Sequence, residues 1–310
     1  MSGSSRTPAR AARADRPGQA PSQPWNMIPD TAFSEHPVTT RAVGPRPSAF
    51  RIHLNLTREL AVTAFKLKYT GSVLGYAWSL VKPLLIFGTT YLVFAVFLLR
   101  GRTKTGENFP VELLVGIVIW TFFADATQSA VSAIVGNAHI VRKAYFPRWI
   151  LVLASTLSAS MTFAVNLALV LVLGFPLGWF HVGLQTLLLP LLFVELYVLV
   201  AGIGLLLSSL FVFYRDLGHV WEITLQLLFY ASAIVFPFSL IPVRFLKLIA
   251  FNPLAQMLED TRRALITPVI PWSSDILGSL LIVPCAAVCL VFGVGFIVFN
   301  RLSPKFGEAL

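Results

Sequence analysis

Residues 184–213 read LQTLLLPLLFVELYVLVAGIGLLLSSLFVF and contain a single charged residue, Glu195. One helical crossing of a bilayer needs about 20 predominantly apolar residues. The stretch exceeds that length, and apolar runs of this kind are typical of membrane proteins rather than of soluble domains. It therefore predicts a membrane-spanning helix.

Further apolar segments lie on both sides of this stretch. The chain is 56% hydrophobic and 12% charged, whereas soluble domains have about 25% charged residues. The first segment is short, but Lys82 and Arg100 at its ends can reach the two interfaces with their long side chains. We therefore predict an all-α integral membrane protein with six transmembrane helices, at about residues 84–99, 111–135, 150–175, 184–213, 223–240 and 276–300.

A more polar segment, residues 50–80, precedes the first span. Its apolar residues recur every three to four positions and lysines and arginines lie among them, which predicts an amphipathic helix. Such a helix suits the cytoplasmic interface, with Tyr69, Tyr76 and Trp78 at headgroup depth. Gly71 and Gly75 are expected to break or bend it. A helix packed against soluble protein is the alternative.

Residues 241–274 combine apolar positions with several prolines and charges. Proline breaks regular structure here, so we predict short re-entrant or interfacial helices between the fifth and sixth spans. Glu259, Asp260 and Asp275 can pair with the four cations of this segment, which are Arg244, Lys247, Arg262 and Arg263.

Residues 1–48 are rich in Pro, Ser, Ala and Gly and contain six arginines and almost no aliphatic run. They cannot bury enough apolar surface to fold, and we expect a disordered cytoplasmic tail rather than a secretory signal. Residues 49–310 then form the transmembrane domain.

The positive charges set the orientation. With both termini in the cytoplasm, the inner segments beyond residue 50 hold eleven lysines and arginines, and the outer segments hold seven. This bias predicts a multi-pass protein of the plasma membrane with both termini cytoplasmic. Because the positive charges are dispersed at segment edges rather than gathered on one face, the net charge of +10 does not indicate nucleic-acid binding.

The link between the second and third spans, residues 142–148, reads RKAYFPR. Its charge is typical of a cytoplasmic loop. Pro147 also takes Phe146 out of helical geometry, so rigid aromatic surface stands beside fixed charges. One interpretation is a loop that only sets topology, with an interfacial aromatic anchor, and the other is a docking surface for a partner.

Motifs of enzyme chemistry are missing from the sequence. Residues 101–106 read GRTKTG and begin like a phosphate-binding loop, but Glu107 and Asn108 replace the lysine and hydroxyl residue that such a loop needs. The five histidines and two cysteines show no metal-ligand spacing. We therefore predict no enzyme activity, no metal and no ATP site in this chain.

Polar residues within the predicted spans are the candidates for a transport path. Asp125 and Glu195 are ionisable, and a charge in the bilayer needs a polar surrounding or a partner. Together with Gln128, Asn166 and Gln226 they line a path or hold helices together. Aromatic Phe87, Tyr91 and Phe94 share one face of the first span and are further lining candidates. Arg215, Asp216 and Glu222 lie between the fourth and fifth spans, where we expect ion pairs with other elements at the cytoplasmic surface. A local turn with solvated charges is the alternative.

Several landmarks resemble the membrane subunit of type 2 ABC exporters, specifically the polysaccharide-export permeases for O-antigen, teichoic acid and galactan. They are the interfacial stretch 60–83, the link from Lys143 to Pro147, Tyr214 to Leu217, and Asn252 with Pro253. The resemblance covers the chain from about residue 50 to its end. The long tail departs from the usual pattern of these permeases.

The resemblance implies a homodimer that works with a dimer of a separate ABC ATPase, which binds the ATP and Mg. The link would be the coupling helix that docks on this ATPase, through Arg142, Lys143, Tyr145, Phe146 and Pro147. The helix before the first span would be a gate for a lipid-linked polysaccharide, at which Lys66, Lys68 and Tyr69 meet the pyrophosphate of the lipid. Arg142 is the alternative cation for this pyrophosphate.

Other functions remain as alternatives. A type 2 ABC permease for a drug, lipid or small molecule would share the fold and the docking surface. An ion-coupled transporter or channel would use Asp125 and Glu195 as ion sites. A membrane-embedded transferase would need clustered carboxylates or histidines at one membrane face.

Overall fold

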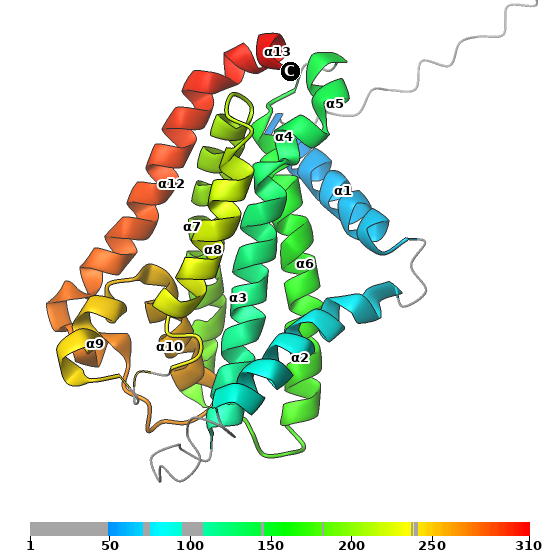
Figure 1. Ribbon diagram of the computed structural model, residues 1–310. Coiled ribbons are helices and arrows are strands. Elements are labelled where there is room, and N and C mark those ends of the chain that lie inside the picture. Colours follow the sequence, from blue (N-terminus) through cyan, green and yellow to red (C-terminus); the bar gives the residue numbers. More distant parts are fainter. Residues whose placement is uncertain are drawn as a thin grey trace, which may run out of the picture. The chain divides into compact units, whose positions relative to one another are not determined.

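The computed structural model describes residues 49–70, 75–94, 108–143, 146–181, 183–236, 238 and 241–310 (Figure 1). Every regular element in this part of the chain is a helix, and the prediction of an all-helical membrane protein is confirmed. The predicted tail, residues 1–48, lies outside the described residues.

Four segments are long and apolar enough to cross a membrane. They contain α3 (Phe109–Val131), α6 (Trp149–Gly174), α7 (Leu189–Phe211) with the short helix η4 (Leu184–Leu188) before it, and α12 (Ile282–Leu302) with the short helices that flank it. These correspond to the predicted second, third, fourth and sixth spans. Hydrophobicity locates them because a helix in lipid must satisfy its backbone internally and cover it with apolar side chains.

The other two predicted spans are shorter. α2 (Trp78–Tyr91) begins six residues before the predicted first span, and the helical path continues in wider turns to Phe94. α8 (Leu217–Ala231) also begins early and ends well before residue 240. The structure thus provides four to five candidate spans, and a six-span topology stays a prediction.

The end of α8 has a local cause. Ala233 takes a left-handed backbone conformation with φ of 55°, which an alanine adopts only when its surroundings hold it there. The side-chain amide of Asn252 donates to the Ser232 hydroxyl at 3.0 Å and to the Ala231 carbonyl at 3.4 Å. A residue from a later segment therefore satisfies the polar groups where α8 stops.

The helix α3 is the centre of the fold. It packs against α2, α6, α7 and α8 and is buried along most of its length, whereas α12 packs on α7 and exposes most of its surface (Figure 1). α7 and α12 come close at two glycines, because a Cβ at Gly295 would collide with the Gly202 carbonyl. Small residues permit such close helix contacts in membranes.

The helix α1 (Ala49–Tyr69) packs against α6 and leaves Phe50, Leu54 and Leu67 exposed. The predicted amphipathic helix is confirmed as a helix, while its place at an interface stays a prediction. It ends before the predicted residue 80. Gly75, with φ of 48°, begins a short turn, η2 (Gly75–Ala77), that leads into α2, and Gly71 lies outside the described residues.

Short helices follow α8 in the region predicted to hold them: α9 (Val243–Ala250), α10 (Pro253–Leu265) and α11 (Ser273–Leu277). Their re-entrant or interfacial position stays a prediction. Asn252 begins α10, since its side-chain oxygen accepts the Leu254 amide at 3.0 Å. α10 is buried against α3 and α7. α9 and α10 lie at one end of the bundle, and α5 (Ala138–Lys143) and α13 (Phe306–Ala309) lie at the other (Figure 1).

Candidate functional site

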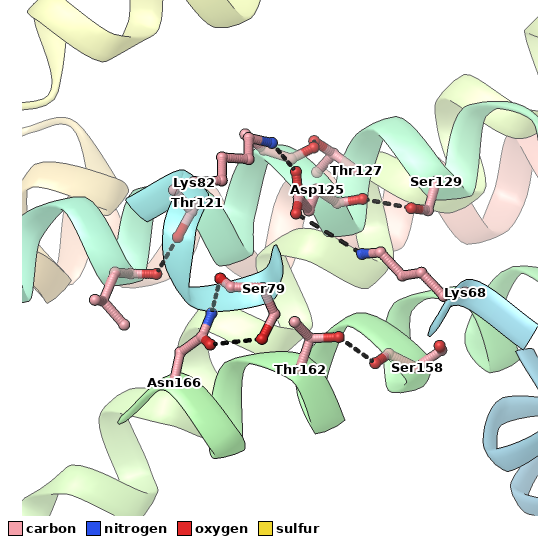
Figure 2. A network of polar contacts seen from close by, with 12 residues as sticks. Lys68, Ser79, Lys82, Thr121, Asp125, Thr127, Ser129, Ser158, Thr162 and Asn166 are labelled. Atoms are coloured by element: carbon pink, nitrogen blue, oxygen red, sulfur yellow. Dashed lines mark hydrogen bonds and ion pairs between the residues drawn. The ribbon is translucent and has the colours of Figure 1, made fainter. Parts of the chain in front are cut away.

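A cluster of three charged side chains joins α1, α2 and α3. The Asp125 carboxylate on α3 accepts a hydrogen bond from the Lys82 amine at 2.7 Å, and the Lys68 amine lies 3.9 Å from its other oxygen (Figure 2). We call these residues the lysine–aspartate cluster. Because the side chains are 42% (Lys68), 55% (Lys82) and 31% (Asp125) exposed, these ion pairs contribute little to stability.

The cluster lines a cavity of about 470 Å³ between α2, α3 and α6. Asn166 of α6 is fixed there by two hydrogen bonds with Ser79 of α2, one from the Ser79 hydroxyl at 3.2 Å and one to the Ser79 carbonyl at 3.1 Å (Figure 2). The aromatic rings of Trp78, Phe122 and Phe163 supply apolar walls. The cavity is therefore amphipathic, since charged groups and aromatic rings both line it.

A second cavity of about 600 Å³ shares Lys82, Asp125 and Gln128 with the first and continues toward α8, where Glu222 and Gln226 line it. The structure thus brings together four of the five polar residues that the sequence indicated as path or packing residues, and Glu222 joins them. Glu195 is placed elsewhere, beside the Cys285 thiol and the Gln256 side chain.

Of the predicted gate residues, Lys68 belongs to the cluster, whereas Lys66 is exposed on α1 outside the lining of both cavities. The backbone of Tyr69 ends α1, and its side chain lies outside the described residues. Sequence reasoning gave Lys82 only an interfacial role. The signal for its present role was a lysine inside an apolar helix start, WSLVKPLL, in a chain that also has an acid in a neighbouring span.

The predicted aromatic lining residues lie on α2 and on the wider turns that continue it to Phe94. Phe87 and Tyr91 stack with ring centres 5.7 Å apart, and Phe94 meets Phe236 edge to face at 5.1 Å. All three predicted rings are half-buried and pack against the central core.

The link between α5 and α6 contacts the C-terminal end of the chain. Arg148 donates a hydrogen bond to the Ser303 carbonyl and lies over the Phe306 ring, 5.9 Å from its centre. A depression of about 720 Å³ is lined by Arg142, Phe146, Pro147 and Arg148 of the link side and by Ser303, Pro304 and Gly307. Sequence reasoning did not predict the C-terminal share of this surface. Tyr145 and the Lys143 side chain lie outside the described residues.

Of the pairings that the sequence allowed in this segment, the structure shows that of Arg262 with Glu259 at 3.0 Å, and both side chains are buried. The Arg262 guanidinium also donates to three carbonyls, those of Glu112, Ala233 and Ile234, at 2.7 to 3.0 Å. It therefore holds the end of α8 against α3 and α10. Burial raises the pKa of the Glu259 carboxyl, although the nearby guanidinium opposes the shift.

The other two carboxylates named in the sequence analysis, Asp260 and Asp275, make contacts other than the expected ion pairs with arginine. The Asp260 carboxylate accepts from the Ser273 amide and the Gln256 side chain, each at 2.8 Å, and burial raises its pKa. Asp275 accepts from the Trp272 amide at 2.9 Å. The Arg263 guanidinium lies over the Trp272 ring.

The segment before α8 forms no ion pair within the part of the chain that the structure describes. The Arg215 guanidinium lies 5.6 Å from the centre of the Phe211 ring, while Glu222 lines the second cavity. Pairing of Arg215 and Asp216 with other elements stays a prediction.

The chain is a multi-pass helical membrane protein, because it has several helices that are long and apolar enough to cross a membrane. One of them is central and buried, and a polar cavity lies between helices. The sequence model of the family described as ABC-2 type transporter matches residues 55–266. The chain belongs to this family, as the resemblance predicted. Proteins of this family are permeases without an ATPase domain of their own, and membership implies a separate ABC ATPase as partner.

Individual relatives cover most of the chain. An O-antigen export system permease protein RfbA of Klebsiella pneumoniae is 27% identical over 245 residues, which are 79% of this chain and 91% of that protein. The protein of the same name from Myxococcus xanthus is 28% identical over 63% of this chain and 74% of its own length. The polysialic acid transport protein KpsM of Escherichia coli is 25% identical over 70% and 83%.

Proposed function

We propose that the chain is the membrane subunit of an ATP-driven exporter that moves a lipid-linked polysaccharide, of the O-antigen or galactan type, from the cytoplasmic to the outer face of the plasma membrane. The observation that carries the proposal is the similarity to O-antigen export permeases, which extends over 91% of one such protein. Both termini lie in the cytoplasm in this proposal, in agreement with the distribution of lysines and arginines.

The ATPase docks on the link. Arg142 is exposed on α5, and Phe146 and Pro147 border the same depression. These residues combine charge with rigid apolar surface, as a docking contact requires. With Lys143 and Tyr145 they transmit closure of the ATPase dimer to α3 and α6, the helices that the link connects.

The polymer enters near α1. Lys66, Lys68 and Tyr69 lie at the C-terminal end of this helix, and lysine amines attract phosphate groups by charge and hydrogen bonds. In the proposed orientation this end of α1 is accessible from the cytoplasmic leaflet.

Two copies of the chain enclose the path. The exposed apolar surfaces of α2, α8 and α12 are available for lipid or for a second copy. Phe87, Tyr91 and Phe94 supply rings on which sugars stack during passage.

Reconstitution tests this function. Proteoliposomes with the chain, its ATPase partner and a lipid-linked polysaccharide should show ATP-dependent movement of the glycan to the far face. Liposomes with an ATPase that cannot hydrolyse ATP are the control. Export driven by an ion gradient without ATP would replace the proposal with an ion-coupled transporter. ATP-dependent movement of a small amphipathic compound alone would replace it with a drug or lipid permease.

A further inference from the structure

The lysine–aspartate cluster places one carboxylate between two amines that come from separate helices. Lys68 and Lys82 each lie within 3.9 Å of the Asp125 carboxylate, so the three side chains together carry one excess positive charge. We propose that Asp125 is an internal counter-ion, and that a diphosphate group binds this cluster by taking the place of the Asp125 carboxylate between the two lysines.

The geometry of the ion pairs suits an exchange. Lys82 donates to one carboxylate oxygen at 2.7 Å, whereas the Lys68 amine lies 3.9 Å from the other oxygen, beyond hydrogen-bond distance. All three side chains are partly exposed, from 31% for Asp125 to 55% for Lys82, so water and a ligand reach them. Exposed pairs of this kind contribute little to stability, and a diphosphate with more negative charge than one carboxylate competes well for them.

The hydroxyl groups that line the cavity already donate hydrogen bonds within the protein, which leaves recognition of a ligand to the charged groups. The hydroxyls of Thr121 and Ser129 donate to carbonyls of their own helix, and the Thr162 hydroxyl donates to the Ser158 carbonyl at 3.4 Å (Figure 2). The Ser79 hydroxyl donates to Asn166. Since these hydroxyl hydrogens are in use, the lysine amines are the strongest donors facing the cavity of about 470 Å³.

A lipid headgroup fits the surroundings better than a free anion. On α2, Leu84 and Leu85 follow Lys82 closely and are 50% and 62% exposed, so an apolar chain can lie along the same helix that supplies the amine. Glu222, which lines the adjoining cavity, disfavours additional negative charge on that side. The proposal that the diphosphate belongs to a lipid rests on the proposed function. The proposal that a diphosphate replaces the Asp125 carboxylate rests only on the lysine–aspartate cluster.

Exchange also has a mechanical consequence. In the unliganded chain, the ends of α1 and α2 are both connected to α3 through Asp125. When a diphosphate takes the two lysines, this connection is lost, and α1 and α2 are held to the ligand instead.

Binding to the purified full-length chain in neutral detergent tests the exchange, with farnesyl diphosphate, inorganic pyrophosphate and farnesol as probes. Asp125→Asn should tighten the binding of farnesyl diphosphate by about two- to fivefold, the range that loss of one exposed competing ion pair gives. Lys82→Gln should weaken it by at least as much, and Lys82→Arg should retain it. Lys247→Gln, which removes an exposed charge on α9, is the matched control and should leave the affinity unchanged.

If the ion pairs of Asp125 only stabilise the structure, the affinity for farnesyl diphosphate should change in the opposite direction, because Asp125→Asn would then loosen the site and weaken binding. Unchanged or weaker binding by Asp125→Asn, in a variant that elutes as the wild type does in gel filtration, overturns the proposal, as does equal binding of farnesol. If Asp125→Asn does not fold, the pair of Lys82→Gln and Lys82→Arg decides, and equal affinities for the two overturn the proposal.

One further comparison distinguishes a lipid headgroup from a free diphosphate as the source of the ligand, and the design of the assay separates the exchange from polysaccharide export. Tighter binding of farnesyl diphosphate than of inorganic pyrophosphate supports a lipid headgroup, and equal affinities overturn that source. The assay contains no ATPase and measures no transport. The exchange therefore stands or fails independently of polysaccharide export.

Discussion

The guanidinium of Arg148 lies 5.9 Å from the centre of the Phe306 ring and donates to the Ser303 carbonyl. This contact joins the link before α6 to the C-terminal helix α13. Phe306 is fully buried, with Phe299 at 5.5 Å and Phe213 at 6.2 Å. The C-terminal end of the chain therefore supports the surface on which we propose that the ATPase docks.

Phe306→Ala should destabilise this end of the bundle by about 3–5 kcal/mol, because the substitution leaves a cavity among aromatic rings. Thermal unfolding in detergent, followed by tryptophan fluorescence, measures the loss. The control is Phe296→Ala, since Phe296 is 45% exposed on α12. Equal losses in the two variants would contradict a supporting role for Phe306.

The contact between α7 and α12 should not tolerate a side chain at Gly295. A Cβ there would collide with the Gly202 carbonyl, a backbone atom that cannot turn aside. We expect Gly295→Ala to cost about 1–3 kcal/mol in unfolding free energy through overpacking. Gly293→Ala is the matched control on the same helix, since its Cβ would meet nothing within 4 Å. A Gly295→Ala variant as stable as Gly293→Ala would show that the helices separate easily.

The buried pair of Arg262 and Glu259 should show strong coupling. Arg262→Met leaves a buried carboxylate without its cation and removes hydrogen bonds to three carbonyls, so we expect a loss of about 3–5 kcal/mol. Adding Glu259→Gln removes the uncompensated charge and should restore part of the stability. Thermal unfolding of the single and double variants measures the coupling. If the two losses were simply additive, the pair would have no special role.

Sequence reasoning located those features that depend on local composition. The long apolar helices were predicted because the membrane imposes length and hydrophobicity on each crossing. Glu259 was identified as a possible partner for the cations of its segment, and its contact with Arg262 is between residues three positions apart on one helix. Asp125 and Lys68 were identified as candidates from their charges, one within an apolar span and one on the amphipathic helix.

Features that depend on contacts between distant segments were missed. α8 stops at Ser232 because the Asn252 side chain satisfies the backbone there, and hydropathy does not report that contact. The partner of Asp125 was missed for the same reason, since only the fold brings Lys82 beside it. The docking link was predicted without its support because Arg148 meets Phe306 only in three dimensions.

Arg142→Glu should weaken docking of the ATPase without destabilising the chain. The Arg142 side chain is exposed on α5 and borders the depression next to the link, so reversing its charge changes the surface and leaves the core intact. Such a change in an interface typically costs about 1–2 kcal/mol or more when the charge contacts the partner. Co-purification with the ATPase, together with ATPase activity in proteoliposomes, measures the effect.

Arg301→Glu provides the matched control, because Arg301 is an exposed arginine near the end of α12, and this helix leads through Ser303–Lys305 to α13. Both variants change the net charge equally, so a general effect of charge would appear in both. We expect Arg142→Glu to weaken ATPase binding and Arg301→Glu to leave it unchanged, with unchanged thermal unfolding in each. Retained binding by Arg142→Glu would leave the link as a loop that sets topology, and the ATPase would then have to dock elsewhere on the cytoplasmic surface.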